Sequence, residues 1–169
     1  LDEALNTEPA PEPAGNFHIT DDDLGIGGPK QKYARNIEAI RTLFQLEQEH
    51  RGATAEEQQV LSQYVGWGGL ADAFNPGKDS WAKEYAELKG LLSEDEYAAA
   101  RSSTLNAHYT SPVVIRSIYD AVEKMGFQSG NILEPSMGAG NFFGMLPTSM
   151  ADSRLYGVEL DSITGRIAK

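Results

Sequence analysis

The stretch Asn131-Ile-Leu-Glu-Pro-Ser-Met-Gly-Ala-Gly-Asn-Phe-Phe-Gly144 is the most informative part of this chain. It begins as a short buried strand over Ile132–Glu134, continues through a Gly-Ala-Gly turn, and predicts a short helix from about Asn141 to Met145. A second strand is expected over Leu155–Leu160. Helices and strands therefore alternate in this half, which predicts an α/β fold with a doubly wound parallel sheet.

The glycine turn fits S-adenosylmethionine better than a dinucleotide. A dinucleotide fingerprint needs a third glycine for close helix–strand packing, and Phe143 occupies that position. The P-loop pattern also fails, because no Gly-Lys-Ser/Thr follows the turn. S-adenosylmethionine carries a sulfonium and an ammonium but no phosphate. Glycines let the backbone approach such a ligand, and Glu134 places a negative charge near its cations.

A second acid, Glu159, is expected at the end of the second strand, about 20 residues after the turn. A carboxylate in that place can accept both ribose hydroxyls of an adenosine. Taken singly, each feature has a plain structural explanation: Glu134 caps a strand end, the glycines form a turn, and Glu159 is a surface acid. The ordered set favours an adenosine-type ligand site over a ligand-free αβ unit.

Residues 30–105 are predicted to be helical. An amphipathic helix is expected from Lys30 to His50, because apolar residues recur there at steps of three and four. Arg51-Gly52 is expected to end it, with the glycine in the left-handed conformation. Further helices are expected from the capping boxes Thr54–Glu57 and Ser93–Glu96, over Trp81–Leu91, and after Ser111-Pro112, where the serine hydroxyl is the predicted cap and Gly126 the predicted end.

The segment Gly66-Trp67-Gly68-Gly69 has two interpretations. Three glycines around one tryptophan predict a tight turn that lays the indole on a neighbouring surface. The indole would either stack on a nucleic-acid base or anchor the packing of the helices. The packing interpretation is favoured, because an acidic chain offers a poor groove for nucleic acid.

The bulk composition limits the function classes. The chain has 169 residues, a net charge of -11 and a sequence pI near 4.6. Such a surface repels phosphate, so this chain by itself is not expected to hold DNA tightly. Cysteine is absent, which excludes disulfides and thiolate metal sites. No apolar run approaches the roughly 20 residues that cross a bilayer, and we expect a soluble cytoplasmic protein without membrane contact.

No metal site is expected. The three histidines are far apart and show no ligand spacing. Asp21-Asp22-Asp23 could suggest calcium, but the alternating oxygen-ligand spacing of a calcium loop is missing, so a solvated acidic turn is preferred.

Three regions are predicted. Residues 1–15 carry Pro9, Pro11 and Pro13 among acids and alanines, which indicates an extended flexible linker. Residues 16–105 form a helical N-terminal region, and residues 106–169 form part of a cofactor-binding domain. A two-stranded sheet is marginal alone. We therefore expect that partners complete the sheet or that the natural protein is longer.

The motifs resemble those of N6-adenine DNA methyltransferases in which the cofactor motifs come first. The aromatic-Thr-x-Pro motif of that family is matched by Tyr109-Thr110-Ser111-Pro112, its cofactor loop by Glu134–Phe142, and its ribose-binding acid by Glu159. The resemblance implies a Rossmann-like fold that binds S-adenosylmethionine, with Thr110 on the methionine carboxylate and the glycine turn beneath the cofactor. The implied cofactor-binding residues are Tyr109, Thr110, Pro112, Glu134, Pro135, Ser136, Gly138, Gly140, Asn141, Phe142, Glu159 and Asp161.

A wider resemblance covers nearly everything from Asn16 onward. The segments Tyr64–Leu70, Leu105–Pro112 and Gly157–Lys169 are similar to the large methyltransferase–helicase proteins of bacterial conjugative elements and phages. In that family a methyltransferase-like region precedes a helicase motor of the SNF2 type. The resemblance implies DNA as the partner of the full-length protein. The helicase part has no counterpart in these 169 residues.

One departure bears on catalysis. The methyltransferases use an Asn/Asp-Pro-Pro-aromatic segment to hold the flipped adenine. The only Asn-Pro here is Asn75-Pro76, which is followed by Gly77 and precedes the cofactor motifs. No catalytic residue is therefore predicted, and these residues alone should bind cofactor weakly at best and catalyse nothing. Two alternatives remain: a degenerate methyltransferase fold that serves as a scaffold for a helicase or conjugation partner, and a nicotinamide-dependent oxidoreductase, which Phe143 disfavours.

Overall fold

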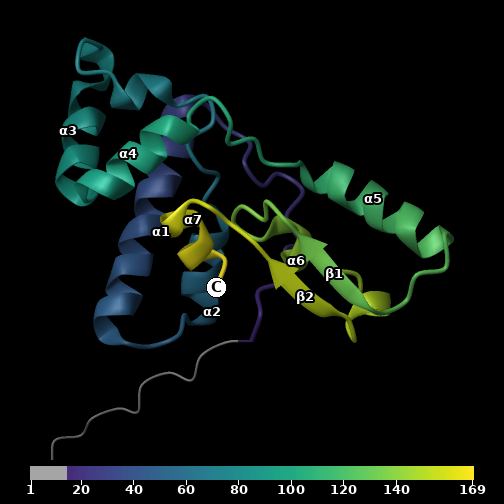
Figure 1. Cartoon of the computed structure of the whole chain (residues 1–169). Helices are drawn as coiled ribbons and strands as arrows, with labels where there is room; N and C mark the ends of the chain where they lie inside the picture. The colour runs from purple at the N-terminus through teal and green to yellow at the C-terminus, as the bar shows by residue number, and fades with distance from the viewer. Residues whose placement is uncertain (1–14) are drawn as a thin grey trace, which may run out of the picture.

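The computed structural model describes residues 15–169, and the predicted linker over residues 1–15 lies almost wholly outside them. Helices dominate the first part and a small parallel sheet lies in the second (Figure 1). The chain is thus a mixed α/β protein, as the sequence predicts. In order, the elements are α1 (Pro29–Glu49), α2 (Ala55–Ser62), η1 (Ala71–Phe74), η2 (Asp79–Trp81), α3 (Ala82–Leu91), α4 (Glu94–Ser103), α5 (Pro112–Lys124), β1 (Asn131–Glu134), α6 (Asn141–Gly144), η3 (Thr148–Met150), β2 (Arg154–Gly157) and α7 (Ser162–Ile167).

Helix α1 forms where the apolar spacing predicts it and buries Tyr33, Ile37 and Ile40 on one face. Its end differs from the prediction. His50, and not Gly52, adopts the left-handed conformation, with φ of 53°. The His50 and Arg51 amides donate to carbonyls of the last turn of the helix. These hydrogen bonds satisfy carbonyls at the end of the helix that the amides around a glycine cap would otherwise satisfy.

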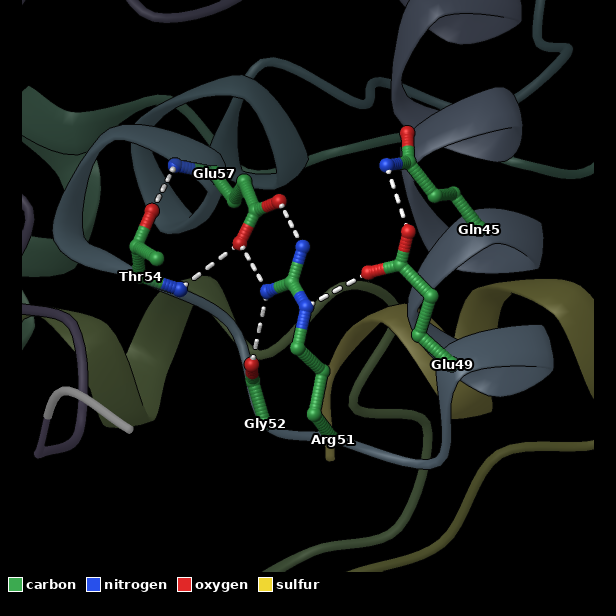
Figure 2. Close-up of polar contacts among 6 residues, drawn as sticks. All are labelled: Gln45, Glu49, Arg51, Gly52, Thr54 and Glu57. Atoms are coloured by element: carbon green, nitrogen blue, oxygen red, sulfur yellow. Dashed lines mark hydrogen bonds and ion pairs between the residues drawn. The ribbon is translucent and has the colours of Figure 1, made fainter. Parts of the chain in front are cut away.

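Arg51 joins the end of α1 to the start of α2 (Figure 2). Its guanidinium donates to both oxygens of Glu57 at 2.6 Å, and its Nε donates to Glu49 at 2.6 Å. The capping box is confirmed, since Thr54 accepts from the Glu57 amide and donates its own amide to the Glu57 carboxylate. The hydrogen bonds from Arg51 hold the pKa of the Glu57 carboxyl at about 2, below its ordinary value of 4.5.

The ion pair of Arg51 with Glu57 predicts a contribution to folding stability that is lost in acid. Glu57→Gln keeps the shape of the capping box but removes the charge that Arg51 binds, so Tm at neutral pH should fall by about 2–4 °C. Because the pKa of Glu57 is lowered in the folded state, its contribution is complete above pH 4.5 and is lost as the pH falls towards about 2. Thermal unfolding of both proteins at pH 7 and at pH 2 measures this. An equal difference at the two pH values would contradict the assignment.

Trp67 lies in the core of the helical part. It is 1% exposed and meets Phe74 edge to face, with ring centroids 5.3 Å apart. Tyr33 of α1 packs against it at 6.2 Å. The packing-anchor interpretation is therefore confirmed, because a base cannot stack on a ring that other side chains cover.

Glycines next to Trp67 allow two backbone segments to touch. A Cβ on Gly68 would lie 1.9 Å from the carbonyl oxygen of Ala107, and the Gly69 amide donates to the Thr104 carbonyl at 3.1 Å. The chain after α4 therefore runs directly along the turn over residues 66–69. Only a residue without a side chain fits at Gly68.

Gly68→Ala should therefore lower the free energy of unfolding by about 3 kcal/mol, because the backbone of Ala107 cannot give way as a side-chain tip could. Gly90→Ala is the matched control. That glycine lies in α3 with no atom near the added Cβ, so its replacement should stabilise the protein by about 0.5–1 kcal/mol. Urea unfolding measures both. Equal stability of the two variants would exclude the close approach.

The sheet is smaller than the sequence predicts. Strands β1 and β2 run parallel in register, with Leu133 beside Tyr156. β2 ends at Gly157, so Glu159 lies beyond the strand and not on its last residues. Ser111 occupies the cap position of α5, but its hydroxyl makes no capping hydrogen bond, which corrects a second expectation. Pro112 at the first helical position starts α5 without it.

Two hydrophobic clusters hold the molecule together, and each takes residues from distant parts of the chain. Ile163 of α7 packs in the helical cluster, whereas Ile19 packs with Ile115 and Tyr119 of α5. Arg166 of α7 reinforces the first contact. It donates to Glu47 of α1 at 2.7 Å and to Glu96 of α4 at 2.9 Å. The helical part and the sheet are thus tied to each other through α7.

Across residues 15–169, no helix combines the length and the apolar character that a bilayer crossing requires.

Candidate functional site

A cavity of about 390 Å³ lies where the sheet meets the helical part. It is lined by the glycine turn, by the segment after β2, by the segment before α5 and by α4. The structure brings together, around this cavity, nine of the residues predicted from sequence: Tyr109, Thr110, Glu134, Ser136, Gly138, Asn141, Phe142, Glu159 and Asp161. The volume is within the range of ligand-binding pockets, roughly 300–1,000 Å³.

The other three predicted residues do not line the cavity. Pro112 is buried at the start of α5, and Pro135 is exposed directly after β1. Gly140 is the cap residue of α6, where its φ of 84° makes the turn into that helix. These residues shape the surrounding backbone.

The glycine turn is fastened to the segment that follows β2. The Met137 amide donates to the Val158 carbonyl at 3.0 Å, and the next amide, that of Gly138, donates to the Glu159 carboxylate at 2.9 Å. The Gly140 amide closes the turn on the Met137 carbonyl at 3.0 Å. Gly138 has a φ of 55°, a conformation that favours glycine. The turn therefore has a fixed position above the end of the sheet.

Glu159 is held in place by backbone amides. One carboxylate oxygen accepts from Gly138, and the other accepts from the Asp161 amide at 2.8 Å. Asp161 in turn caps α7 by accepting from the Thr164 amide at 2.7 Å. Each carboxylate oxygen has two acceptor directions, so both oxygens of Glu159 keep one for a ligand hydroxyl.

The lining is acidic. Among the residues that the structure describes, the cavity walls contain the carboxylates of Glu134, Glu159 and Asp161 but no lysine or arginine. An arrangement of this kind attracts cations and accepts hydrogen bonds from hydroxyls and amines. It disfavours phosphate, which would face three negative charges without a positive partner.

Sequence reasoning missed the contribution of the helical part. Tyr64 and Gly66 line the cavity, as do Ser102 and Ser103 of α4 and Asn106 and His108 beyond it. The hydroxyl of Thr164 donates to that of Tyr64 at 3.2 Å, and both groups are buried. The glycine-tryptophan turn was a signal for a close approach, but its partner, the segment 104–109, could not be read from spacing.

Asn36 of α1 orients the part of the helical wall that contains Gly66. Its side-chain oxygen accepts from the Val65 amide at 2.9 Å, and its nitrogen donates to the Gly66 carbonyl at 2.5 Å. The side chain is fully buried, so no water can replace these bonds. Asn36 thereby fixes the turn without lining the cavity itself.

Asn36→Ala should cost about 2–3 kcal/mol of stability, because it leaves a half-buried amide and a buried carbonyl without their partners. Asn36→Asp serves as a second variant. It keeps the acceptor for the Val65 amide but loses the donor to the Gly66 carbonyl and adds a buried charge. Both variants should unfold at lower urea concentration than the wild type. A loss below 0.5 kcal/mol (on the order of a surface substitution) for Asn36→Ala would show that these bonds contribute little.

A second cleft, of about 520 Å³, lies between α1 and α3. Two of its charged groups, Arg41 and Glu87, already bind each other. Arg41 contacts Glu87 at 2.8 Å, and Tyr33 donates to the same carboxylate at 2.9 Å. The acidic cavity is therefore the stronger candidate for a ligand site.

No protein-family model matches the chain, and neither a curated protein nor a solved structure matches it.

Proposed function

We propose that this chain is the S-adenosylmethionine-binding part of a DNA adenine-N6 methyltransferase-like protein. The observation that carries the proposal is the acidic cavity, in which a glycine turn and three carboxylates from two segments of the chain line one hollow. Dispersed surface acids would not gather in this way. The cofactor is a cation with a ribose diol, so it suits both the charge and the hydrogen-bonding capacity of these walls.

The residues present fit this cofactor. Glu134 and Thr110 would hold the methionine portion, and Glu159, supported by Asp161, would hold the ribose hydroxyls. Gly138 holds Glu159 through its amide, and the absence of a side chain there makes room for the ring of Tyr109. When bound, the cofactor would supply a methyl group that passes directly from a sulfonium to an amine.

A larger Rossmann-like sheet is part of the proposal. Leu133 and Tyr156, which pair across the two strands, are 63% and 49% exposed. Val158 is 57% exposed in the same region. Apolar side chains on one face of a parallel sheet are normally covered, since both faces of such sheets pack against helices. This surface therefore suits a domain in which further strands and helices complete the fold.

The catalytic step is assigned to the whole protein and not to these residues. The sequence has no Asn/Asp-Pro-Pro-aromatic segment that could hold a flipped adenine. Its net charge of -11 also makes it a poor binder of phosphate. We therefore place recognition of DNA and the helicase function outside these 169 residues.

A non-catalytic scaffold is the second candidate. Both oxygens of Glu159 already accept amide hydrogen bonds, which is how a purely structural carboxylate behaves. In that case the former cofactor turn would only stiffen a docking module. The two candidates differ in whether the cavity binds ligand at all.

Isothermal titration of the 169-residue chain with S-adenosylmethionine tests the proposal. Binding is expected, and Glu134→Gln, which keeps the side-chain shape, should weaken it at least tenfold, or about 1.4 kcal/mol. Glu159→Ala should weaken it by at least as much. Asp120→Asn, on the exposed side of α5, changes the net charge equally and should leave the affinity unchanged.

Three outcomes would count against the proposal. An absence of heat with S-adenosylmethionine would favour the scaffold, as would a loss that is equal for Glu134→Gln and Asp120→Asn. Binding of NAD in its place would favour an oxidoreductase.

A further inference from the structure

The ring of Tyr109 lies between two glycines from different parts of the molecule. A Cβ on Gly66, in the helical part, would lie 2.7 Å from Cε2 of the ring. A Cβ on Gly138, in the cofactor turn, would lie 3.1 Å from Cε1. The two glycines therefore contact opposite edges of one aromatic ring. A rigid, planar side chain in such a place transmits a displacement from one side to the other.

Both glycines are in the left-handed conformation, with φ of 65° at Gly66 and 55° at Gly138. Any other residue at either position would be strained in this backbone conformation. Burial raises the pKa of the Tyr109 hydroxyl well above its ordinary value, and the negative charges of Glu159 and Asp161 add to this shift. The ring is thus partly buried, and its hydroxyl stays neutral.

The two ends of this contact are fixed by separate interactions. On one side, Asn36 holds the Gly66 carbonyl, and the close contact of Gly68 with Ala107 keeps the turn against the segment that carries Tyr109. On the other side, the Gly138 amide donates to the carboxylate of Glu159. A path of direct contacts therefore leads from the core of α1 to the acid that faces the cavity.

We propose that Tyr109 is a positioning residue that sets the glycine turn and Glu159 for ligand binding and makes their geometry depend on the helical part. The helical part is then a component of the cofactor site and not only a neighbouring unit. The effect of Tyr109 on cofactor affinity rests on the proposed function. Its effect on the position of Gly138 does not rest on that function and can be tested without any ligand.

Gly66→Ala and Gly69→Ala form a matched pair. Both glycines lie in the same turn and have left-handed φ values, 65° and 74°, so both replacements introduce similar backbone strain. Only at Gly66 does the added methyl meet the ring, since nothing lies within 4 Å of a Cβ on Gly69. The difference between the two variants isolates the contact with Tyr109.

Hydrogen exchange of the Gly138 amide is the readout that needs no ligand. Gly66→Ala should speed this exchange at least tenfold relative to the amide of Ile40, which reports the buried core of α1. Gly69→Ala should leave the ratio unchanged. A change of equal size in both variants, or no change in either, would overturn the coupling.

Titration with S-adenosylmethionine supplies the second readout. Gly66→Ala should weaken binding at least tenfold more than Gly69→Ala does. Because Gly66 also lines the cavity, a double-mutant cycle with Tyr109→Leu separates obstruction by the methyl from displacement of the ring. If the ring transmits the effect, Gly66→Ala costs no further affinity once Tyr109 is replaced. If the two losses add, the methyl acts directly and the proposal is wrong.

Tyr109→Phe keeps the ring and should leave the exchange of the Gly138 amide unchanged, because ring carbons and not the hydroxyl face Gly138. If Gly66→Ala speeds the exchange of the Gly138 amide but the wild type binds no S-adenosylmethionine, the role of Tyr109 stands and the proposed function is wrong. If the wild type binds S-adenosylmethionine but Gly66→Ala does not change the exchange of the Gly138 amide, the proposed function stands and the role of Tyr109 is wrong.

Discussion

The close approach of two backbone segments beside Trp67 is the constraint on which the arrangement depends. Gly68 lies so near the carbonyl of Ala107 that no side chain fits between them. This contact lays the segment before α5 along the turn that ends the helical core. The ring of Tyr109 is then brought to Gly66 on one side and to Gly138 on the other. Tyr109 and both of these glycines line the cavity.

Charge and hydrogen bonding give the cavity its chemical character. Glu134 is the last residue of β1, whereas Glu159 and Asp161 follow β2. Because the two strands are parallel, these acids lie at the same edge of the sheet. Backbone amides orient Glu159 without using all of its acceptor capacity. The same bonds that would prepare a carboxylate for a ribose diol would also serve a rigid scaffold. Ligand binding, and not further geometry, separates these two roles.

Much of the local structure follows from the sequence, because its signals are short in range. Periodic apolar residues locate α1, and the Thr54–Glu57 and Ser93–Glu96 capping boxes form as expected. The predictions are wrong at two element ends, where backbone hydrogen bonds and not the expected residue decide where the element stops. His50 takes the left-handed position in place of Gly52, and β2 stops before Glu159 because the chain there bonds to the glycine turn.

The composition of the site was only partly predictable. The acids and the glycine turn are close in sequence to the strands that position them, and the cavity includes them. The cavity wall formed by Tyr64, Gly66 and α4 depends on contacts between segments some 40 residues apart in sequence. Local sequence patterns cannot predict such contacts. The glycines around Trp67 indicated that something approaches closely, but not what.

In the folded chain, the ring of Tyr109 lies against both glycine turns. Nuclear Overhauser effects from the ring protons of Tyr109 measure this arrangement directly. Cross-peaks to the α-protons of Gly66 and of Gly138 are expected in the same spectrum. Cross-peaks to only one of these glycines, in a folded protein, would contradict it.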